Sequence, residues 1–119
     1  MMTRKFTVKR SQWLRGTGNA EVVDDHHASY LLNPVNGKMC CWGFYCLAAG
    51  AKKKDIRRVG DLNGLGGIVG LPNNNDEIDD PVVRASYAVN DSDDLDDHAR
   101  ETVLKLMFST LGIEVKFED

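Results

Sequence analysis

The sequence predicts an α+β domain in which a small, mainly antiparallel sheet packs against a buried central helix and an amphipathic C-terminal helix. Residues 5–10 and 113–118, near the two ends, alternate apolar and polar side chains as half-buried strands do. Residues 40–49 are apolar on nearly every side, which is typical of a buried helix. Residues 90–97 are rich in Asp and precede a stretch with helical spacing that Gly112 closes.

The sheet is expected to contain an N-terminal strand, a central hairpin and a C-terminal strand. The two terminal strands are short and both alternate, so we expect them to pair with each other. Residues 29–33 and 38–41 flank "PVNG", in which Asn36 and Gly37 both tolerate positive φ. This predicts a hairpin with its tip at residues 34–37. The predicted core draws on every element: Phe6, Val8, Leu31, Phe44, Leu47, Leu106, Ile113, Val115 and Phe117.

The segments between the hairpin and the C-terminal helix carry clear stop signals. The central helix is expected to end at Gly50, and residues 51–60 predict a short exposed helix anchored by Ile56 and Val59. Five glycines in residues 60–70, followed by "LPNNN", predict a flexible loop over residues 60–75. Asp80 and Pro81 are typical of a helix start, although residues 81–89 are compatible with a strand as well. In the C-terminal helix two sets of residues follow helical spacing: Leu95, Ala99, Val103, Leu106 and Thr110, and also Val103, Met107 and Leu111.

Length and charge limit the kind of protein. A chain of 119 residues, 42% hydrophobic, predicts one globular domain over residues 1–119. The longest charge-free apolar run, residues 39–51, is too short to cross a bilayer, and "MMTRKFTV" has no apolar leader. We therefore expect a soluble cytoplasmic protein that does not bind membranes.

Positive and negative charges are unevenly distributed along the chain. Residues 1–60 carry 11 Lys/Arg and 4 Asp/Glu, a net charge of +7, whereas residues 61–119 carry 4 and 14, a net charge of −10. We expect the two halves to attract each other on one surface. The alternative is a two-faced distribution that serves a partner.

The three cysteines have the wrong spacing for a metal site. Neighbouring Cys40 and Cys41 point to opposite sides of a strand, or roughly 100° apart on a helix, and Cys46 lies roughly 140° round a helix from Cys41. We therefore predict buried free thiols, with no metal, cofactor or disulfide. The alternative is a nucleophilic Cys41 at a helix N-terminus, approached by one of the histidines His26, His27 and His98.

Two charged clusters are candidate binding surfaces. Helix capping uses only two or three carboxylates of the acidic cluster, so the rest suit a protein partner with a basic surface. The acidic cluster consists of Asp76, Glu77, Asp79, Asp80, Asp91, Asp93, Asp94, Asp96 and Asp97. The basic cluster, the alternative for a phosphate-bearing ligand, consists of Lys52, Lys53, Lys54, Arg57 and Arg58. The acidic cluster is the preferred interpretation.

Three stretches together resemble a known group of proteins: "KFTVKRSQWLRG", "NGKMCCWGFYCLAAG" and "VND…LGIEVKFED". They are similar to a family of small uncharacterised proteins from bacteriophages and bacterial genomes, with an M-C-C-x-G-F helix and a final G-I-x-V-x-F strand. The family brings no catalytic residue that can be carried over. The resemblance implies a phage or prophage accessory protein acting in the bacterial cytoplasm.

Two classes of function therefore remain. The first is a non-enzymatic protein that binds and inhibits or redirects a bacterial host or defence protein. It is preferred because the sequence shows no set of acid, base and nucleophile. The alternative is a small nucleotide- or nucleic-acid-binding protein, or an enzyme, with a site near residues 60–75.

Overall fold

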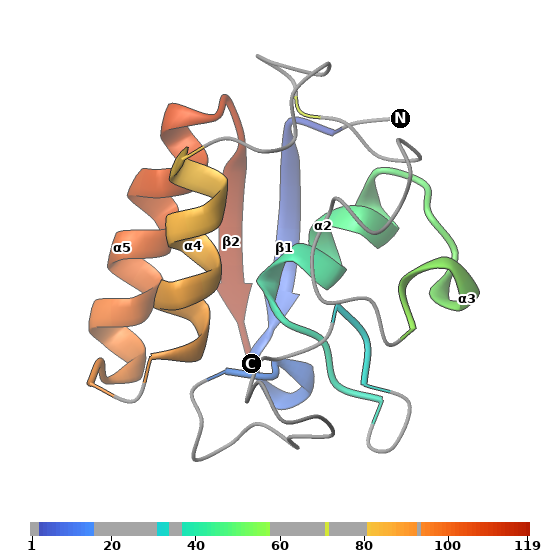
Figure 1. Ribbon diagram of the computed structural model, residues 1–119, viewed down its shortest axis with the longest axis horizontal. Helices are drawn as coiled ribbons and strands as arrows, with labels where there is room; N and C mark the ends of the chain where they lie inside the picture. The colour runs from blue at the N-terminus through green and yellow to red at the C-terminus, as the bar shows by residue number, and fades with distance from the viewer. Residues whose placement is uncertain (1–2, 16–30, 34–36, 58–70, 72–80, 93) are drawn as a thin grey trace.

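The computed structural model describes residues 3–15, 31–33, 37–57, 71, 81–92 and 94–119. Within these residues the chain forms four α-helices and a two-stranded parallel sheet (Figure 1). The elements follow in the order β1 (Lys5–Lys9), the 3-10 helix η1 (Arg10–Gln12), α2 (Cys41–Ala48), α3 (Lys53–Ile56), α4 (Pro81–Asp91), α5 (Asp97–Thr110) and β2 (Glu114–Glu118). Helix α2 packs on β1, α5 packs on β2, and α4 packs on α5. None of the described helices has the length and apolar character that crossing a bilayer requires.

The two terminal strands pair with each other, as their alternation predicts. Their register aligns Lys5 with Glu114 and Lys9 with Glu118, and in both strands every second side chain is buried. The predicted antiparallel direction is wrong, because the strands run parallel. Alternation specifies which face of a strand is buried, but it says nothing about the direction of its neighbour.

The predicted central hairpin does not supply strands to the sheet. Its two arms are joined, since the Asn33 N–H donates to the Lys38 carbonyl at 2.8 Å, but neither described arm forms a strand. Met39 instead bridges Trp13 just after η1, and Leu32 bridges Arg57. The backbone of each arm is thus used by another segment, so the expectation of a three-part antiparallel sheet is wrong.

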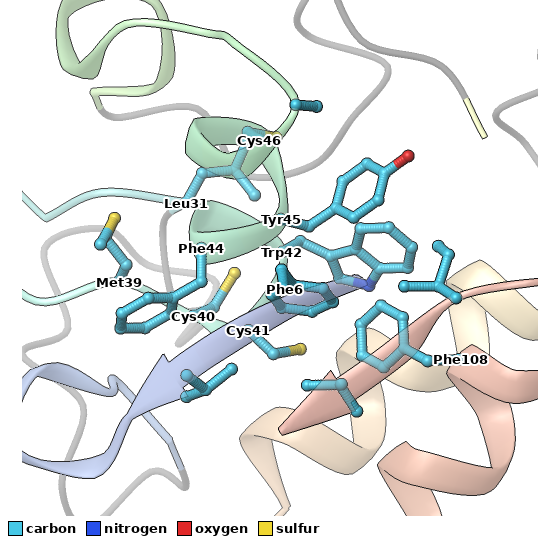
Figure 2. Packing of buried hydrophobic residues seen from close by; sticks show 14 of the residues in the cluster. Phe6, Leu31, Met39, Cys40, Cys41, Trp42, Phe44, Tyr45, Cys46 and Phe108 are labelled. Carbon is cyan, nitrogen blue, oxygen red and sulfur yellow. The ribbon is translucent and has the colours of Figure 1, made fainter. Parts of the chain in front are cut away.

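The core lies between the sheet and the helices (Figure 2). Aromatic rings from three elements meet there: Phe6 packs edge-on against Tyr45 and Phe108, and Trp42 lies 4.7 Å from the Phe108 ring. The predicted core is correct for seven of its nine members, which are buried: Phe6, Val8, Leu31, Phe44, Ile113, Val115 and Phe117. Leu47 is only partly buried.

Leu106 is the clear error in the predicted core, because it is 65% exposed. Helix α5 turns Leu104, Phe108 and Leu111 inward instead. Both sets of residues have helical spacing, and the buried face also contains Arg100 and Glu101. Charged residues usually mark the exposed face of a helix, so Arg100 and Glu101 made the face that is buried look exposed. The sequence pattern therefore favoured the face that contains Leu106.

The remaining helices agree with their sequence signals. Helix α2 is followed by Gly50, whose φ of 108° suits only glycine. Residues 81–91 are helical, with Pro81 at the start, and α3 is anchored by buried Ile56. The predicted anchor Val59, the cap Asp80 and the flexible loop at residues 60–75 lie outside the described residues, apart from Leu71, which is buried.

Candidate functional site

The three thiols are free and buried, and they are unsuited to nucleophilic chemistry. Cys41 is the first residue of α2, the position that the nucleophile hypothesis needs. Its environment has the opposite effect, because burial raises the pKa of the Cys41 thiol well above its usual value. Burial likewise raises the pKa of Cys40 to about 12, and it raises the pKa of Cys46. Desolvation therefore outweighs any help from the helix N-terminus.

The N-terminus of α2 is occupied by a side chain from α4. The Oδ1 of buried Asn90 accepts hydrogen bonds from the Cys41 backbone N–H at 3.1 Å and from the Trp13 indole at 2.8 Å. The Nδ2 of Asn90 donates to the Leu14 carbonyl at 3.0 Å and to Asp91 at 2.9 Å. The Asn90 side chain therefore joins α4 to the start of α2 and to residues 13–14, which follow η1. The helix end has one of its free N–H groups satisfied from within the chain.

The histidines do not assemble a catalytic or metal site in the described part of the chain. His98 is exposed on the first turn of α5, while His26 and His27 lie outside the described residues. Among the residues that the structure describes, no three His, Cys, Asp or Glu side chains gather closely enough to hold a metal ion. No ion pair joins His98 to a carboxylate among the described residues.

Much of the described acidic cluster serves the fold. Asp96 caps α5, its Oδ1 accepting from the Ala99 N–H at 2.8 Å. Asp97 accepts two bonds from Arg15, both at 2.9 Å, and one from Arg100 at 2.8 Å. The hydrogen bond from Arg15 holds the pKa of Asp97 below its usual value. Capping and ion pairs thus use Asp96 and Asp97, and the ion pairs of Asp97 are a role that the sequence does not show.

The other acidic residues divide into two groups. Asp91 accepts a bond from Asn90 and is half-buried, whereas Asp94 is exposed. Five of the nine lie outside the described residues: Asp76, Glu77, Asp79, Asp80 and Asp93.

The two oppositely charged halves of the chain attract each other, as expected. Arg10 binds both carboxylate oxygens of Glu101 at 2.8 Å and reaches Asp119 at 2.9 Å. The Arg15–Asp97 pair joins the same two halves. These bonds fasten η1 and the segment after it to α5 and the C-terminus. They also raise the pKa of Arg10, with the bond to Glu101 as the main cause.

The basic cluster is arranged differently, because its described side chains surround a hollow. Lys53 and Lys54 of α3 and the adjacent Arg57 line a cavity of about 350 Å³, opposite Asn33 and Gly37. Its remaining described wall is Leu32, whose backbone bridge to Arg57 holds the two segments together. Lys52, at the start of α3, is also exposed, whereas Arg58 lies outside the described residues.

The cations around this hollow are not neutralised by the described part of the chain. Lys53, Lys54 and Arg57 are exposed and form no ion pair with any described residue. The nearby carboxylate, Asp55, accepts a bond from the Lys52 backbone N–H at 3.0 Å, which closes the first turn of α3. A local excess of positive charge therefore faces outward here.

Sequence reasoning missed the buried polar residues that position these surfaces. Ser86 accepts from the Trp42 indole at 2.7 Å, and Asn90 lies one turn further along α4. Arg100 is buried and donates to the carbonyls of Val89 and Leu95, which ties the end of α4 to α5. The available signal was spacing, since Val83, Ser86 and Asn90 follow one another at helical intervals on the buried face of α4.

No protein-family model, curated protein or solved structure significantly matches this chain. The case for a function therefore rests on the residues and surfaces described above.

Proposed function

We propose that this chain is a non-enzymatic binding protein that engages an acidic protein partner through its basic surface, defined as Lys52, Lys53, Lys54 and Arg57. The observation that carries the proposal is the hollow of about 350 Å³ whose lining includes Lys53, Lys54 and Arg57, three cations that no described carboxylate neutralises. Uncompensated like charges repel one another, so their grouping is favoured when a partner of opposite charge covers them.

The state of the reactive groups supports binding over catalysis. Catalysis needs a nucleophile or base with a pKa near the working pH and a partner within hydrogen-bond reach. Burial raises the pKa of all three thiols, so they stay protonated near neutral pH. The one described histidine, His98, is exposed on a helix. A binding protein needs none of these features.

The lining of the hollow favours a protein partner over a nucleotide. Its described walls contain Leu32, Asn33 and Gly37 beside the three cations, and no aromatic ring on which a base would stack. The whole chain has a net charge of −3, which weakens non-specific attraction to nucleic acid. A carboxylate-bearing protein surface needs only complementary charge and shape.

The resemblance to phage and bacterial proteins suggests where such binding would matter. In that setting the chain is an accessory protein of a phage or prophage, acting in the bacterial cytoplasm. Its partner is then a host or defence protein, which it inhibits or redirects by covering an acidic site. This biological role is part of the proposal and rests on the resemblance alone.

A capture experiment with charge variants tests the proposal. Tagged wild-type protein and the variant Lys53→Gln/Lys54→Gln/Arg57→Gln are used to capture proteins from nuclease-treated bacterial lysate. The matched control, Lys5→Gln/Lys9→Gln/Lys116→Gln, loses the same charge from the exposed face of the sheet. We expect a stoichiometric acidic protein with the wild type and the control, but not with the first variant.

Two results would count against this surface. If the variant Lys53→Gln/Lys54→Gln/Arg57→Gln captured the partner as well as the wild type does, the binding site would lie elsewhere on the protein. Capture from untreated lysate that disappears after nuclease treatment, together with tight binding of a labelled oligonucleotide to the purified protein, would favour the nucleic-acid alternative. Circular dichroism of each variant shows that it is folded before any loss of binding is interpreted.

The acidic cluster is the second candidate surface, with a basic protein as its partner. Asp94 and Asp96 are exposed near the start of α5, and the Asp97 carboxylate is 48% exposed. Because Asp97 holds Arg15 and Arg100, its replacement would change the fold as well as the surface. The cleaner variant is Asp93→Asn/Asp94→Asn. The acidic cluster would be favoured if this variant failed to capture a basic protein that both the wild type and the variant Lys53→Gln/Lys54→Gln/Arg57→Gln capture.

A further inference from the structure

Strand β2 has one edge that no described residue covers. The Glu114 N–H donates to the Arg4 carbonyl at 2.8 Å, so Glu114 directs its backbone groups toward β1. In a strand the next residues alternate, so Val115 and Phe117 direct their N–H and C=O groups to the other side. No described residue bonds these outward groups. An edge of this kind is a template for another strand.

A hollow opens at the start of β2. The hollow has a volume of about 400 Å³ and is lined by Arg4, by residues 112–115, and by Lys105 and Ser109 on α5, so along β2 it reaches as far as Val115. Figure 1 shows β2 and α5 on the opposite side of β1 from α3. The hollow is thus separate from the basic surface, and binding at one does not require the other.

The charges along β2 argue against pairing with a second copy. Glu114, Lys116 and Glu118 are the exposed side chains of β2. An antiparallel pair of two copies centred on Lys116 would place Glu114 of each copy opposite Glu118 of the other, and the two lysines opposite each other. Like charges directly opposite destabilise a strand pair. The same holds for β1, where Lys5 would face Lys9. The registers centred on Val115 or Phe117 would instead set Lys116 of each copy opposite Glu114 or Glu118 of the other, but they match only two charged positions. A segment with opposite charges at all three positions complements β2 more fully than a second copy does.

The sheet itself shows which charges this edge accepts. Lys5 lies opposite Glu114, Thr7 opposite Lys116, and Lys9 opposite Glu118. A strand on the free side of β2 meets the same three side chains on the exposed face. A segment with two cations flanking a polar or acidic residue, at alternate positions, complements them. The pattern reads the same in both directions, so charge does not select a parallel or antiparallel partner.

We propose that the free edge of β2 binds an extended segment of a partner protein by strand addition, and that the segment carries a cation–x–acid–x–cation pattern. Backbone bonds to Val115 and Phe117 would supply affinity, while Glu114, Lys116 and Glu118 would select the sequence. This inference goes beyond the proposed function, because the basic surface attracts carboxylates and this edge attracts lysine or arginine.

The amide protons of β2 provide the direct test. The probe is a capped seven-residue peptide with the central order lysine, threonine, glutamate, threonine, lysine, and the control peptide has the central order glutamate, threonine, lysine, threonine, glutamate. In the free protein the outward Val115 and Phe117 amides should exchange with solvent quickly. We expect the first peptide to slow this exchange at least tenfold and the control peptide to have no effect. Unchanged Val115 and Phe117 exchange with the bound probe would overturn the proposal.

Backbone methylation of the peptide and one protein variant complete the test. N-methyl groups on the peptide amides that face β2 should abolish binding, whereas N-methyl groups on the alternate amides should leave it intact. Equal effects of the two sets would rule out strand addition. The variant Glu114→Gln/Glu118→Gln should bind the first peptide roughly 2- to 30-fold more weakly, because it loses two exposed cross-strand charge pairs. The methylated peptides need no change in the protein, so a destabilised variant does not affect the conclusion.

Discussion

The Nε of Arg15 and the Oδ1 of Asp97 lie 2.9 Å apart, and Arg15 Nη2 is equally close to Asp97 Oδ2. Two parallel bonds of this kind fix both position and orientation. Arg15 also stacks over the Trp13 ring, with 4.7 Å between its guanidinium carbon and the ring centroid. The first turn of α5 is thereby tied to the segment after η1. The acidic start of α5 is consequently part of the fold as well as part of the surface.

Replacement of Asp97 tests this structural role. Asp97→Asn leaves Arg15 and Arg100 without their charged acceptor, and we expect a loss of about 1 kcal/mol in the free energy of unfolding at pH 7, reduced by partial exposure of the carboxylate. Urea denaturation measures this loss. The control Asp94→Asn, at an exposed carboxylate, should change stability by less than about 0.5 kcal/mol. Equal effects of the two changes would contradict the role given to Asp97.

The same pair predicts how stability depends on pH. Folding lowers the pKa of Asp97 below its usual value of 3.8, so the folded state favours the charged carboxylate. The contribution is complete well above that value and is lost as the pH falls through the lowered pKa. We therefore expect the stability difference between wild type and Asp97→Asn to be constant above about pH 5 and to shrink below about pH 4. A difference that grows in acid would be the wrong sign.

Asn90 should be the most sensitive polar position of the described core. Asn90→Ala leaves the Trp13 indole N–H, the Cys41 N–H and the Leu14 carbonyl without this partner in a buried site. Each such loss costs about 1–3 kcal/mol, so we expect a total of at least about 3 kcal/mol. Thermal and urea unfolding measure the change. A variant as stable as wild type would show that water or a rearranged side chain replaces the amide.

The thiols should react only when the protein unfolds. All three are buried, and burial raises the pKa of Cys40 to about 12, so little thiolate is present at pH 8. We expect a disulfide reagent such as DTNB to modify none of them in native protein and all three in urea. Reaction of one thiol at a rate faster than unfolding would indicate local opening around α2.

How far the sequence predicts the fold depends on how local the relevant interactions are. The burial of Phe6 and Val8, and of Val115 and Phe117, can be predicted from the sequence. Apolar and polar residues alternate in each strand, and this pattern involves only residues next to one another in the chain. The parallel direction of the strands depends on packing of the whole chain. The prediction that the hairpin supplies strands to the sheet failed for a similar reason, because the backbone of Met39 bonds Gln12 and Leu14, at and just after η1.

The candidate site is even less predictable from sequence. The partner of Asp97 lies 82 positions away at Arg15, and that of Glu101 lies 91 positions away at Arg10. A sequence shows how many carboxylates a segment holds, but it does not show which of them distant arginines bind. The basic cluster was easier to identify, because Lys53, Lys54 and Arg57 are close together in the chain and remain exposed.

The close contact between α2 and the segment at Leu31 yields the last prediction. A Cβ atom added to Gly43 would overlap the Leu31 carbonyl oxygen and would lie 2.8 Å from the Cβ of Met39. Without such a contact, alanine would stabilise a helix by about 1 kcal/mol relative to glycine. Because a backbone atom cannot move aside as a side chain does, we expect Gly43→Ala to destabilise the protein by about 2 kcal/mol or more. The reverse change at an exposed site of the same helix, Ala48→Gly, serves as the control and should cost only about 1 kcal/mol. Urea unfolding of both variants compares them, and a Gly43→Ala protein more stable than wild type would show that Leu31 does not lie against α2 in solution.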